Sequence, residues 1–153
     1  MYRPQYWSYA PGLGRIIIDI PTRTLSFYYS GRSFGPYPLG LGKTSTPTPA
    51  GNWKVIEKYK NPAWEVLGSR WMGLDVSFGN YGIHGTNADW AIGTYVSNGC
   101  IRMHNWDVEA IYPYVVIGTP VVITGSYPGS YQVDQWWLRV KTRSRFLGTS
   151  RHR

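Results

Sequence analysis

The stretch Ser97-Asn98-Gly99-Cys100-Ile101-Arg102-Met103 contains the only cysteine of this chain, sixteen residues after the histidine of Ile83-His84-Gly85-Thr86. A solitary cysteine cannot form an intrachain disulfide, so its thiol is a packed side chain, an intermolecular link or a reactive group. Gly99 frees the backbone before the sulfur, and the two residues ahead of it are polar, whereas a buried structural cysteine usually has apolar neighbours. These surroundings favour a nucleophile.

A cysteine nucleophile needs a base, because a free thiol is only a few per cent ionised at neutral pH. His84 is the best candidate, since it follows a short apolar stretch that predicts a strand ending at the histidine. His104, four residues past the sulfur, is the second candidate, and His152 lies in a basic tail. We expect folding to bring the His84 imidazole within hydrogen-bonding reach of the thiol.

Acyl transfer also needs donors for the developing oxyanion. We expect the backbone N–H groups of Gly99 and Cys100 to supply them, if Gly99 adopts a conformation that other residues avoid. No Asp or Asn stands out as the group that would hold the second nitrogen of the imidazole. A backbone carbonyl near Gly85 is therefore the expected partner of that nitrogen.

Composition predicts one mainly β domain. The 153 residues include 18 Gly and 11 Pro scattered among stretches rich in Val, Ile, Tyr and Trp, which is typical of short strands joined by turns. The longest apolar stretch, residues 114–124, is interrupted by Gly118 and Pro120, so no membrane span is expected. The first residues lack the apolar core of a signal peptide.

The positive charge is concentrated at the end of the chain. The formal net charge is +8, and six basic residues against one acidic residue after Gly125 carry +5 of it. Such a tail attracts polyanions, whether nucleic acid, anionic lipid or anionic wall polymer. We therefore divide the chain into an N-terminal arm (1–14), a catalytic domain (15–125) and a basic extension (126–153).

Periodicity and turn residues place the elements. Thr46-Pro47-Thr48-Pro49-Ala50-Gly51 is expected to be an extended connector, because a residue before proline avoids the helical region. One helix is expected over residues 105–112, with Asn105 as its N-cap and Pro113 as its limit. Strands are expected at residues 15–20, 24–29, 33–42, 52–59, 71–78, 81–84 and 119–124.

Three motifs together resemble the catalytic signature of the L,D-transpeptidase (YkuD-type) domain. They are Tyr81-Gly82-Ile83-His84-Gly85-Thr86, Ile92-Gly93, and Ser97-x-Gly99-Cys100-Ile101-Arg102-Met103. Upstream, Gly42-Lys43 and Thr46-Pro47-Thr48-Pro49-x-Gly51 are also similar to that family, and the resemblance covers about residues 15–124. It implies a mainly β, compact sandwich or barrel-like L,D-transpeptidase catalytic fold with one or two short helices.

The resemblance assigns roles to residues of this chain. Cys100 would be the nucleophile that accepts the acyl group, and His84 its base. Many members carry histidine where this chain has Asn98, so the resemblance implies a Cys/His pair here. The residues that would bind substrate or the oxyanion are Ser97, Asn98, Gly99, Arg102, Gly85 and Thr86.

The implied reaction is part of peptidoglycan biosynthesis. Cys100 would attack the bond between the diamino acid and D-alanine of a tetrapeptide stem, and an amine of another stem would take the acyl group in a 3-3 cross-link. Water as acceptor would make the enzyme an L,D-carboxypeptidase. The resemblance also implies acylation of Cys100 by carbapenems. It implies no metal or other cofactor, stem peptides as partners, and an extracytoplasmic wall or spore-associated location for a monomer.

Other interpretations of the same residues remain open. A non-catalytic module that binds cell wall or nucleic acid would explain the tail and the aromatic residues, although nucleic acid is not the expected partner. A papain-like peptidase is set aside, because its cysteine precedes its histidine, the reverse of the order here. Arg102 would bind a stem carboxylate or, equally, form an ion pair with Asp75 or Asp89.

Overall fold

The computed structural model describes residues 14–128 of the chain. The expected N-terminal arm, apart from Gly14, and the basic extension after residue 128 lie outside these residues. Within the described part, no helix is both long and apolar enough to cross a membrane.

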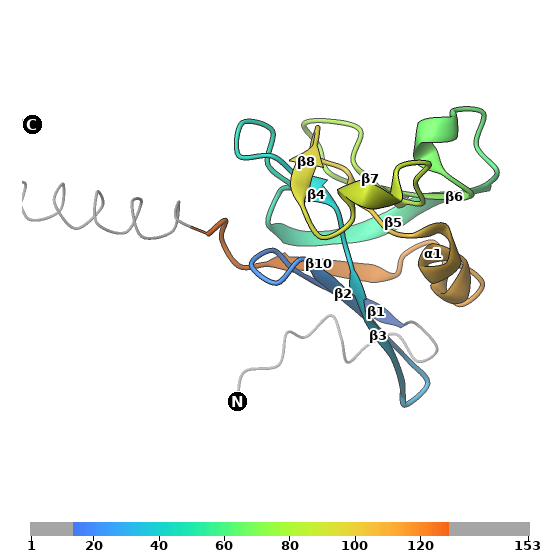
Figure 1. Ribbon diagram of the computed structural model, residues 1–153. Helices are drawn as coiled ribbons and strands as arrows, with labels where there is room; N and C mark the ends of the chain where they lie inside the picture. The colour runs from blue at the N-terminus through green and yellow to red at the C-terminus, as the bar shows by residue number, and fades with distance from the viewer. Residues whose placement is uncertain (1–13, 129–153) are drawn as a thin grey trace, which may run out of the picture.

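Eight strands form one curled sheet in the order β3-β2-β1-β10-β5-β6-β7-β9 (Figure 1). Its strands are β1 Arg15–Asp19, β2 Thr24–Tyr29, β3 Arg32–Pro38, β5 Gly51–Lys60, β6 Arg70–Leu74, β7 Gly82–His84, β9 Ile101–Arg102 and β10 Pro120–Thr124. Two further strands, β4 Leu41–Gly42 and β8 Tyr95–Ser97, form a separate parallel pair. The one α-helix of residues 14–128 is α1, Asn105–Ile111. The predicted mainly β fold with few short helices is thus confirmed.

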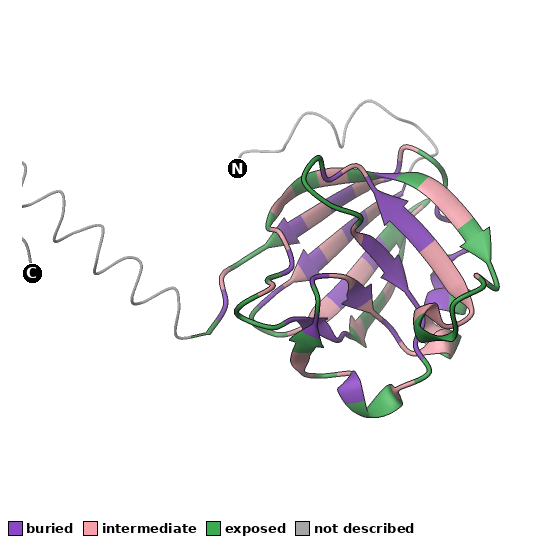
Figure 2. Ribbon diagram, turned by 90° about the horizontal axis from the view of Figure 1, so that it is seen from above, coloured by how far each residue is buried: buried purple, intermediate pink, exposed green. Residues whose placement is uncertain are grey.

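The core lies inside the curl of the sheet. Successive side chains of a strand point to opposite faces, and buried residues alternate with partly exposed ones along β1 and β10 (Figure 2). These two strands pair in parallel, so that Ile16 is opposite Val121 and Ile18 is opposite Ile123, all of them buried. The strand that opens the domain and the strand that closes it therefore lie side by side.

The main departure from the predicted strands is at residues 39–42. The third strand was expected to run unbroken to Gly42, but β3 ends at Pro38 and Gly40 bridges to Arg102 of β9. The chain leaves β2 here because it crosses to the nucleophile motif. The short strands β8 and β9 and the 3-10 helices η2 Glu65–Leu67 and η3 Asp89–Ala91 were not predicted, since two or three residues show no periodicity.

The predicted helix is present, but its start differs from the prediction. His104 occupies the N-cap position and no side chain caps the helix, so the assignment of Asn105 as N-cap is wrong. Asn105 is instead the first helical residue, and its side chain points to backbone outside the helix. Val108 and Ile111 are buried and attach the helix to the core.

Candidate active site

His84 ends β7, and Cys100 directly precedes β9, the parallel neighbour of β7. In the register of β7 and β9, Ile83 is opposite Ile101 and His84 is opposite Arg102. The two isoleucines are fully buried in the core. Because side chains alternate along a strand, His84, Arg102 and Cys100 share the other face, with Cys100 directly ahead of β9.

The thiol of Cys100 is half-buried and its sulfur lies 3.6 Å from the carbonyl oxygen of Asn80, to which it donates. Burial raises the pKa of the Cys100 thiol, an effect that the Gly82 backbone and the positive charge of Arg102 oppose. The raised pKa keeps the sulfur protonated at neutral pH. A base is therefore needed to take its proton during attack.

His84 is held as a neutral imidazole. Its side chain is 3% exposed, and Nδ1 lies 2.5 Å from the carbonyl oxygen of Gly85. The ring stacks on Trp71, with 5.7 Å between ring centroids. Burial lowers the pKa of His84 to about 4, against the opposing effect of the Gly85 carbonyl. The backbone carbonyl expected to orient the imidazole is present, and Nδ1–H donating to it leaves Nε2 as the basic nitrogen.

The direct hydrogen bond expected between thiol and imidazole is not formed within residues 14–128. The thiol instead donates to Asn80, and the imidazole is bound to Gly85. Catalytic hydrogen bonds are often long or misaligned in the absence of substrate, and tighten when it binds.

The turn before Cys100 has the conformation that the sequence predicted, but a different hydrogen-bond pattern. Gly99 has φ +119°, and a Cβ at this position would lie 2.5 Å from the ring of Tyr81. The Gly99 N–H donates to Ser97 Oγ at 3.1 Å, and Ser97 Oγ donates to the Cys100 carbonyl at 2.7 Å. The Gly99 N–H is thus engaged inside the turn and is not free, in this structure, for the oxyanion role expected of it.

The Cys100 N–H has no acceptor among the described residues, so of the two donors expected for the oxyanion it is the one that the turn leaves free. Ser97 is 1% exposed, and its hydroxyl makes both of its hydrogen bonds inside the turn. Asn98 is exposed at the tip of the turn. Thr86 is likewise buried, with its hydroxyl accepting from the Ala88 N–H at 2.9 Å. Thr86 therefore shapes its loop instead of facing substrate.

Arg102 has no acidic partner in the described part of the chain. Asp75 accepts from the Lys54 N–H, and Asp89 pairs with His104, so the predicted alternative of an ion pair with either aspartate is wrong. Its positive charge acts to lower the pKa of both Cys100 and His84. A carboxylate that binds here would neutralise this cation.

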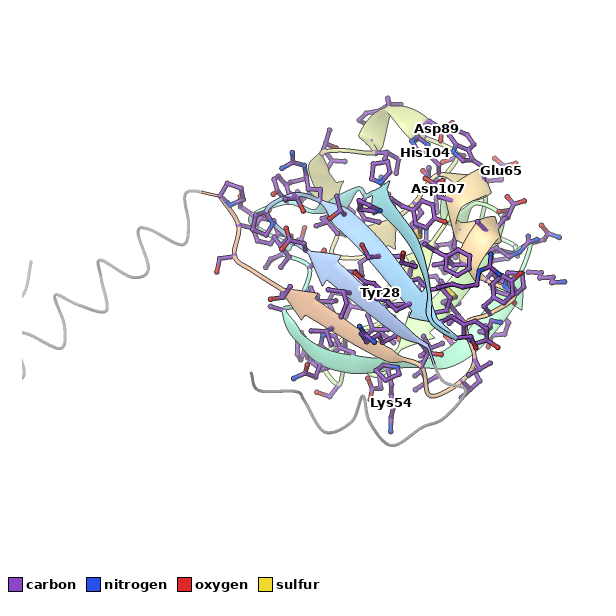
Figure 3. The ribbon with its side chains drawn as sticks, turned by 90° about the horizontal axis from the view of Figure 1, so that it is seen from below. Tyr28, Lys54, Glu65, Asp89, His104 and Asp107 are labelled. Carbon is purple, nitrogen blue, oxygen red and sulfur yellow. The ribbon has the colours of Figure 1, made fainter. Side chains whose placement is uncertain are left out.

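His104, the second candidate base, is engaged elsewhere. Its Nδ1 lies 2.7 Å from Asp89 Oδ1, and its ring stacks on Trp106 with 4.3 Å between centroids. Figure 3 shows His104 and Asp89 together near the start of α1. His84 is therefore the histidine that shares a face with the thiol.

Asn105 is a site residue whose role the sequence did not reveal. Its Oδ1 accepts from the backbone N–H groups of Ser69 and Thr86, both at 3.1 Å. A Cβ on Gly85 or Gly68 would overlap this oxygen, so both glycines are packed directly against it. Because Gly85 presents its carbonyl to His84, Asn105 positions the group that orients the imidazole.

We expect Asn105→Leu, which removes the acceptor at similar volume, to lower the rate of Cys100 acylation by about 10²-fold, the cost of a misplaced catalytic group. Asn105→Asp keeps an oxygen acceptor in the same place and is the matched control, with a rate within a few-fold of the wild type. The measurement is the rate of covalent adduct formation with a carbapenem. Equal rates for Asn105→Leu and the wild type would show that the Gly85 carbonyl is held without Asn105.

Comparison with known families gives a single answer. Residues 14–123 match the family model of the L,D-transpeptidase catalytic domain, YkuD. The chain belongs to the L,D-transpeptidase family. It is 37% identical over 128 residues to YqjB of Bacillus subtilis, with 74% of this chain and 73% of that protein aligned. It is 43% identical over 110 residues to YkuD of Bacillus licheniformis, with 72% of this chain and 65% of that protein aligned. Both relatives carry the L,D-transpeptidase name.

Solved L,D-transpeptidases have the same fold. L,D-transpeptidase 3 of Mycobacterium tuberculosis superposes with a TM-score of 0.64 at 22% identity, over 74% of this chain and 61% of that one. The chain thus spans less than two thirds of the YkuD relative and of this solved protein. L,D-transpeptidases act on peptidoglycan, and membership of the family implies action at the cell wall.

Proposed function

We propose that the protein is a peptidoglycan L,D-transpeptidase with a Cys100 acyl-enzyme intermediate. The observation that carries the proposal is that His84 of β7, Arg102 of β9 and Cys100 directly ahead of β9 lie together, with no acidic partner for Arg102 among residues 14–128. This arrangement combines a nucleophile, a neutral base and a cation for a substrate carboxylate. The match to the L,D-transpeptidase family supports the same reaction.

Acylation begins with attack of Sγ on the carbonyl carbon between the diamino acid and the terminal D-alanine. His84 Nε2 takes the thiol proton as the C–S bond forms, since thiol and imidazole are both neutral at pH 7. The Cys100 N–H is placed to donate to the resulting oxyanion. Collapse breaks the C–N bond, and the imidazolium returns its proton to the amine of the departing D-alanine.

Deacylation repeats these steps with a new nucleophile. The side-chain amine of a second stem attacks the thioester and gives its proton to His84 Nε2. The C–S bond then breaks, and the imidazolium returns the proton to the sulfur of Cys100, which restores the thiol. Arg102 would bind the carboxylate of D-alanine in the first step, because charge-assisted hydrogen bonds to carboxylates are the strongest type available to arginine. Water in place of the amine would give L,D-carboxypeptidase activity at the same site.

The rest of the chain is consistent with action on the wall. The basic extension at residues 126–153 carries most of the net positive charge, and anionic wall polymers would attract it. We propose that these charges increase residence on the wall and take no part in the chemistry.

The experiment is incubation of the full chain with a disaccharide-tetrapeptide, followed by mass spectrometry of protein and products. We expect an acyl adduct on Cys100, released D-alanine and a dimer with a 3-3 cross-link. Tripeptide without dimer would identify water as the acceptor and the enzyme as an L,D-carboxypeptidase. Binding of the fragment with neither adduct nor D-alanine would overturn the proposal in favour of a non-catalytic module.

A further inference from the structure

A buried hydrogen-bond network lies beneath the nucleophile turn, and the mechanism above does not use it. Thr48 Oγ1 donates to the Gly99 carbonyl at 2.8 Å and accepts from the Gly42 N–H at 2.9 Å. The Tyr127 hydroxyl donates to the Gly42 carbonyl at 2.6 Å and accepts from the Thr48 N–H at 2.8 Å. Four residues from three separate parts of the chain are therefore joined in one hydrogen-bond network: Gly42, Thr48, Gly99 and Tyr127.

Each member of this network is shielded from solvent. Thr48 is 2% exposed and Tyr127 is 8% exposed, although Thr48 lies in what the sequence predicted to be a plain connector. A Cβ on Gly42 would lie 3.0 Å from the Gly99 Cα, so the end of β4 is packed closely against the nucleophile turn. Buried hydrogen bonds of this kind are costly to break, because the freed groups cannot reach water.

Tyr127 lies beyond the last strand and beyond residue 123, where the family match ends. Its ring packs against Tyr95, with 5.0 Å between centroids. Tyr95 begins β8, and β8 ends at Ser97, the first residue of the nucleophile motif. Tyr127 therefore contacts the nucleophile turn through β8 on one side and through Thr48 on the other.

The contact of Thr48 with Gly99 acts on the oxyanion donor. The Gly99 carbonyl and the Cys100 N–H belong to one planar peptide unit, so they can turn only together. Thr48 holds the carbonyl end, and the N–H end is the donor that the turn leaves over. Without the hydroxyl, the peptide plane is free to rotate next to a glycine, whose backbone is the least restricted of all residues.

We propose that Thr48 and Tyr127 are positioning residues that aim the Cys100 N–H at the oxyanion, and that the catalytic unit thus extends to Tyr127 instead of ending at residue 125. The inference rests on the proposed acyl-transfer function. Thr48 acts on the donor directly, and Tyr127 acts by fixing Thr48 and Gly42. Neither residue touches substrate.

The test compares Thr48→Val, which removes the hydroxyl at equal volume, with Thr48→Ser, which retains it. For Thr48→Val we expect kcat for D-alanine release to fall by about 10- to 100-fold, below the about 10²- to 10³-fold cost of losing an oxyanion donor outright. KM should stay within about twofold, because the oxyanion forms only in the transition state. The kcat of Thr48→Ser should be close to that of the wild type. The kcat of Tyr127→Phe should lie between those of Thr48→Val and Thr48→Ser.

Alkylation of Cys100 by iodoacetamide separates aiming from folding, since this reaction forms no oxyanion. Its rate should change by less than about threefold in all three variants, whose folding is checked by circular dichroism. The proposal would be overturned if the alkylation rate and kcat fell in parallel, or if the kcat of Thr48→Val were unchanged. It would also be overturned if the kcat of Thr48→Ser fell as much as that of Thr48→Val. If the wild-type protein releases no D-alanine, the proposed function fails, while the rate of carbapenem acylation, which passes through an oxyanion, still tests the positioning.

Discussion

Replacing Cys100 with alanine abolishes adduct formation and lowers D-alanine release by at least about 10⁴-fold, because loss of a covalent nucleophile removes the whole acyl-enzyme route. Cys100→Ser should be nearly as inactive. A serine hydroxyl is far less acidic than a thiol, and the Nδ1 of His84 is bound to the Gly85 carbonyl and to no carboxylate of the described residues. The measurements are D-alanine release and the intact mass of the protein after exposure to a carbapenem.

The matched control is Ser77→Ala, a substitution at an exposed position outside the motif, which should leave both measurements unchanged. Cys100→Ala should also fold normally, since the half-buried thiol donates only one long hydrogen bond. Undiminished D-alanine release by Cys100→Ala would exclude the acyl-enzyme. A carbapenem mass shift that survives the substitution would assign the reactive group to another residue.

His84→Gln should lower kcat/KM by about 10²- to 10⁴-fold, the usual contribution of a general base. The glutamine amide can still donate to the Gly85 carbonyl, so the variant removes the basic nitrogen with little loss of buried hydrogen bonding. His104→Gln is the control, because His104 is paired with Asp89 away from the thiol. Equal losses in both variants would contradict the assignment of the base.

The pH dependence distinguishes His84 from an ordinary histidine. The base must be neutral to accept the proton, so kcat/KM should be level from about pH 5 to 7 and fall tenfold per unit below its pKa of about 4. An acid limb near pH 6.5, the ordinary value, would show that the base is not the buried His84. The profile is measured on D-alanine release at low substrate concentration.

The stability of the protein should also depend on the protonation of His84, and it should decrease as the pH falls. The folded-state pKa lies below the unfolded-state value of 6.5, so the unfolded chain takes up the proton first as pH falls. The effect of His84 on the free energy of unfolding is absent above pH 6.5. Toward pH 4 it becomes increasingly destabilising, by about 3 kcal/mol in total. Urea titrations of wild type and His84→Gln at pH 7 and pH 4.5 measure the difference. If the wild type loses as much stability between pH 7 and pH 4.5 as His84→Gln does, His84 is not the cause of the loss.

Much of the local structure could be predicted from the sequence. Alternating apolar residues located β1, β2, β5 and β10, and the Pro113 limit agreed with a helix that ends at Ile111. These predictions are confirmed because alternation and proline act over a few neighbouring residues. The prediction of an unbroken third strand was wrong, since the break at Pro38 depends on the bridge from Gly40 to Arg102, sixty-two residues away in sequence.

The sequence by itself determined the chemistry that the chain can support: one thiol, a histidine at a strand end, a glycine before the sulfur, and the family to which these motifs belong. Only the tertiary structure decided which groups are available. Among the residues that it describes, it left Arg102 without an acidic partner, used the Gly99 N–H and the Ser97 hydroxyl inside the turn, and placed Thr48 and Tyr127 beneath it. The physical reason is that burial and hydrogen bonding join residues distant along the chain, and no local pattern records which distant partner satisfies a buried polar group.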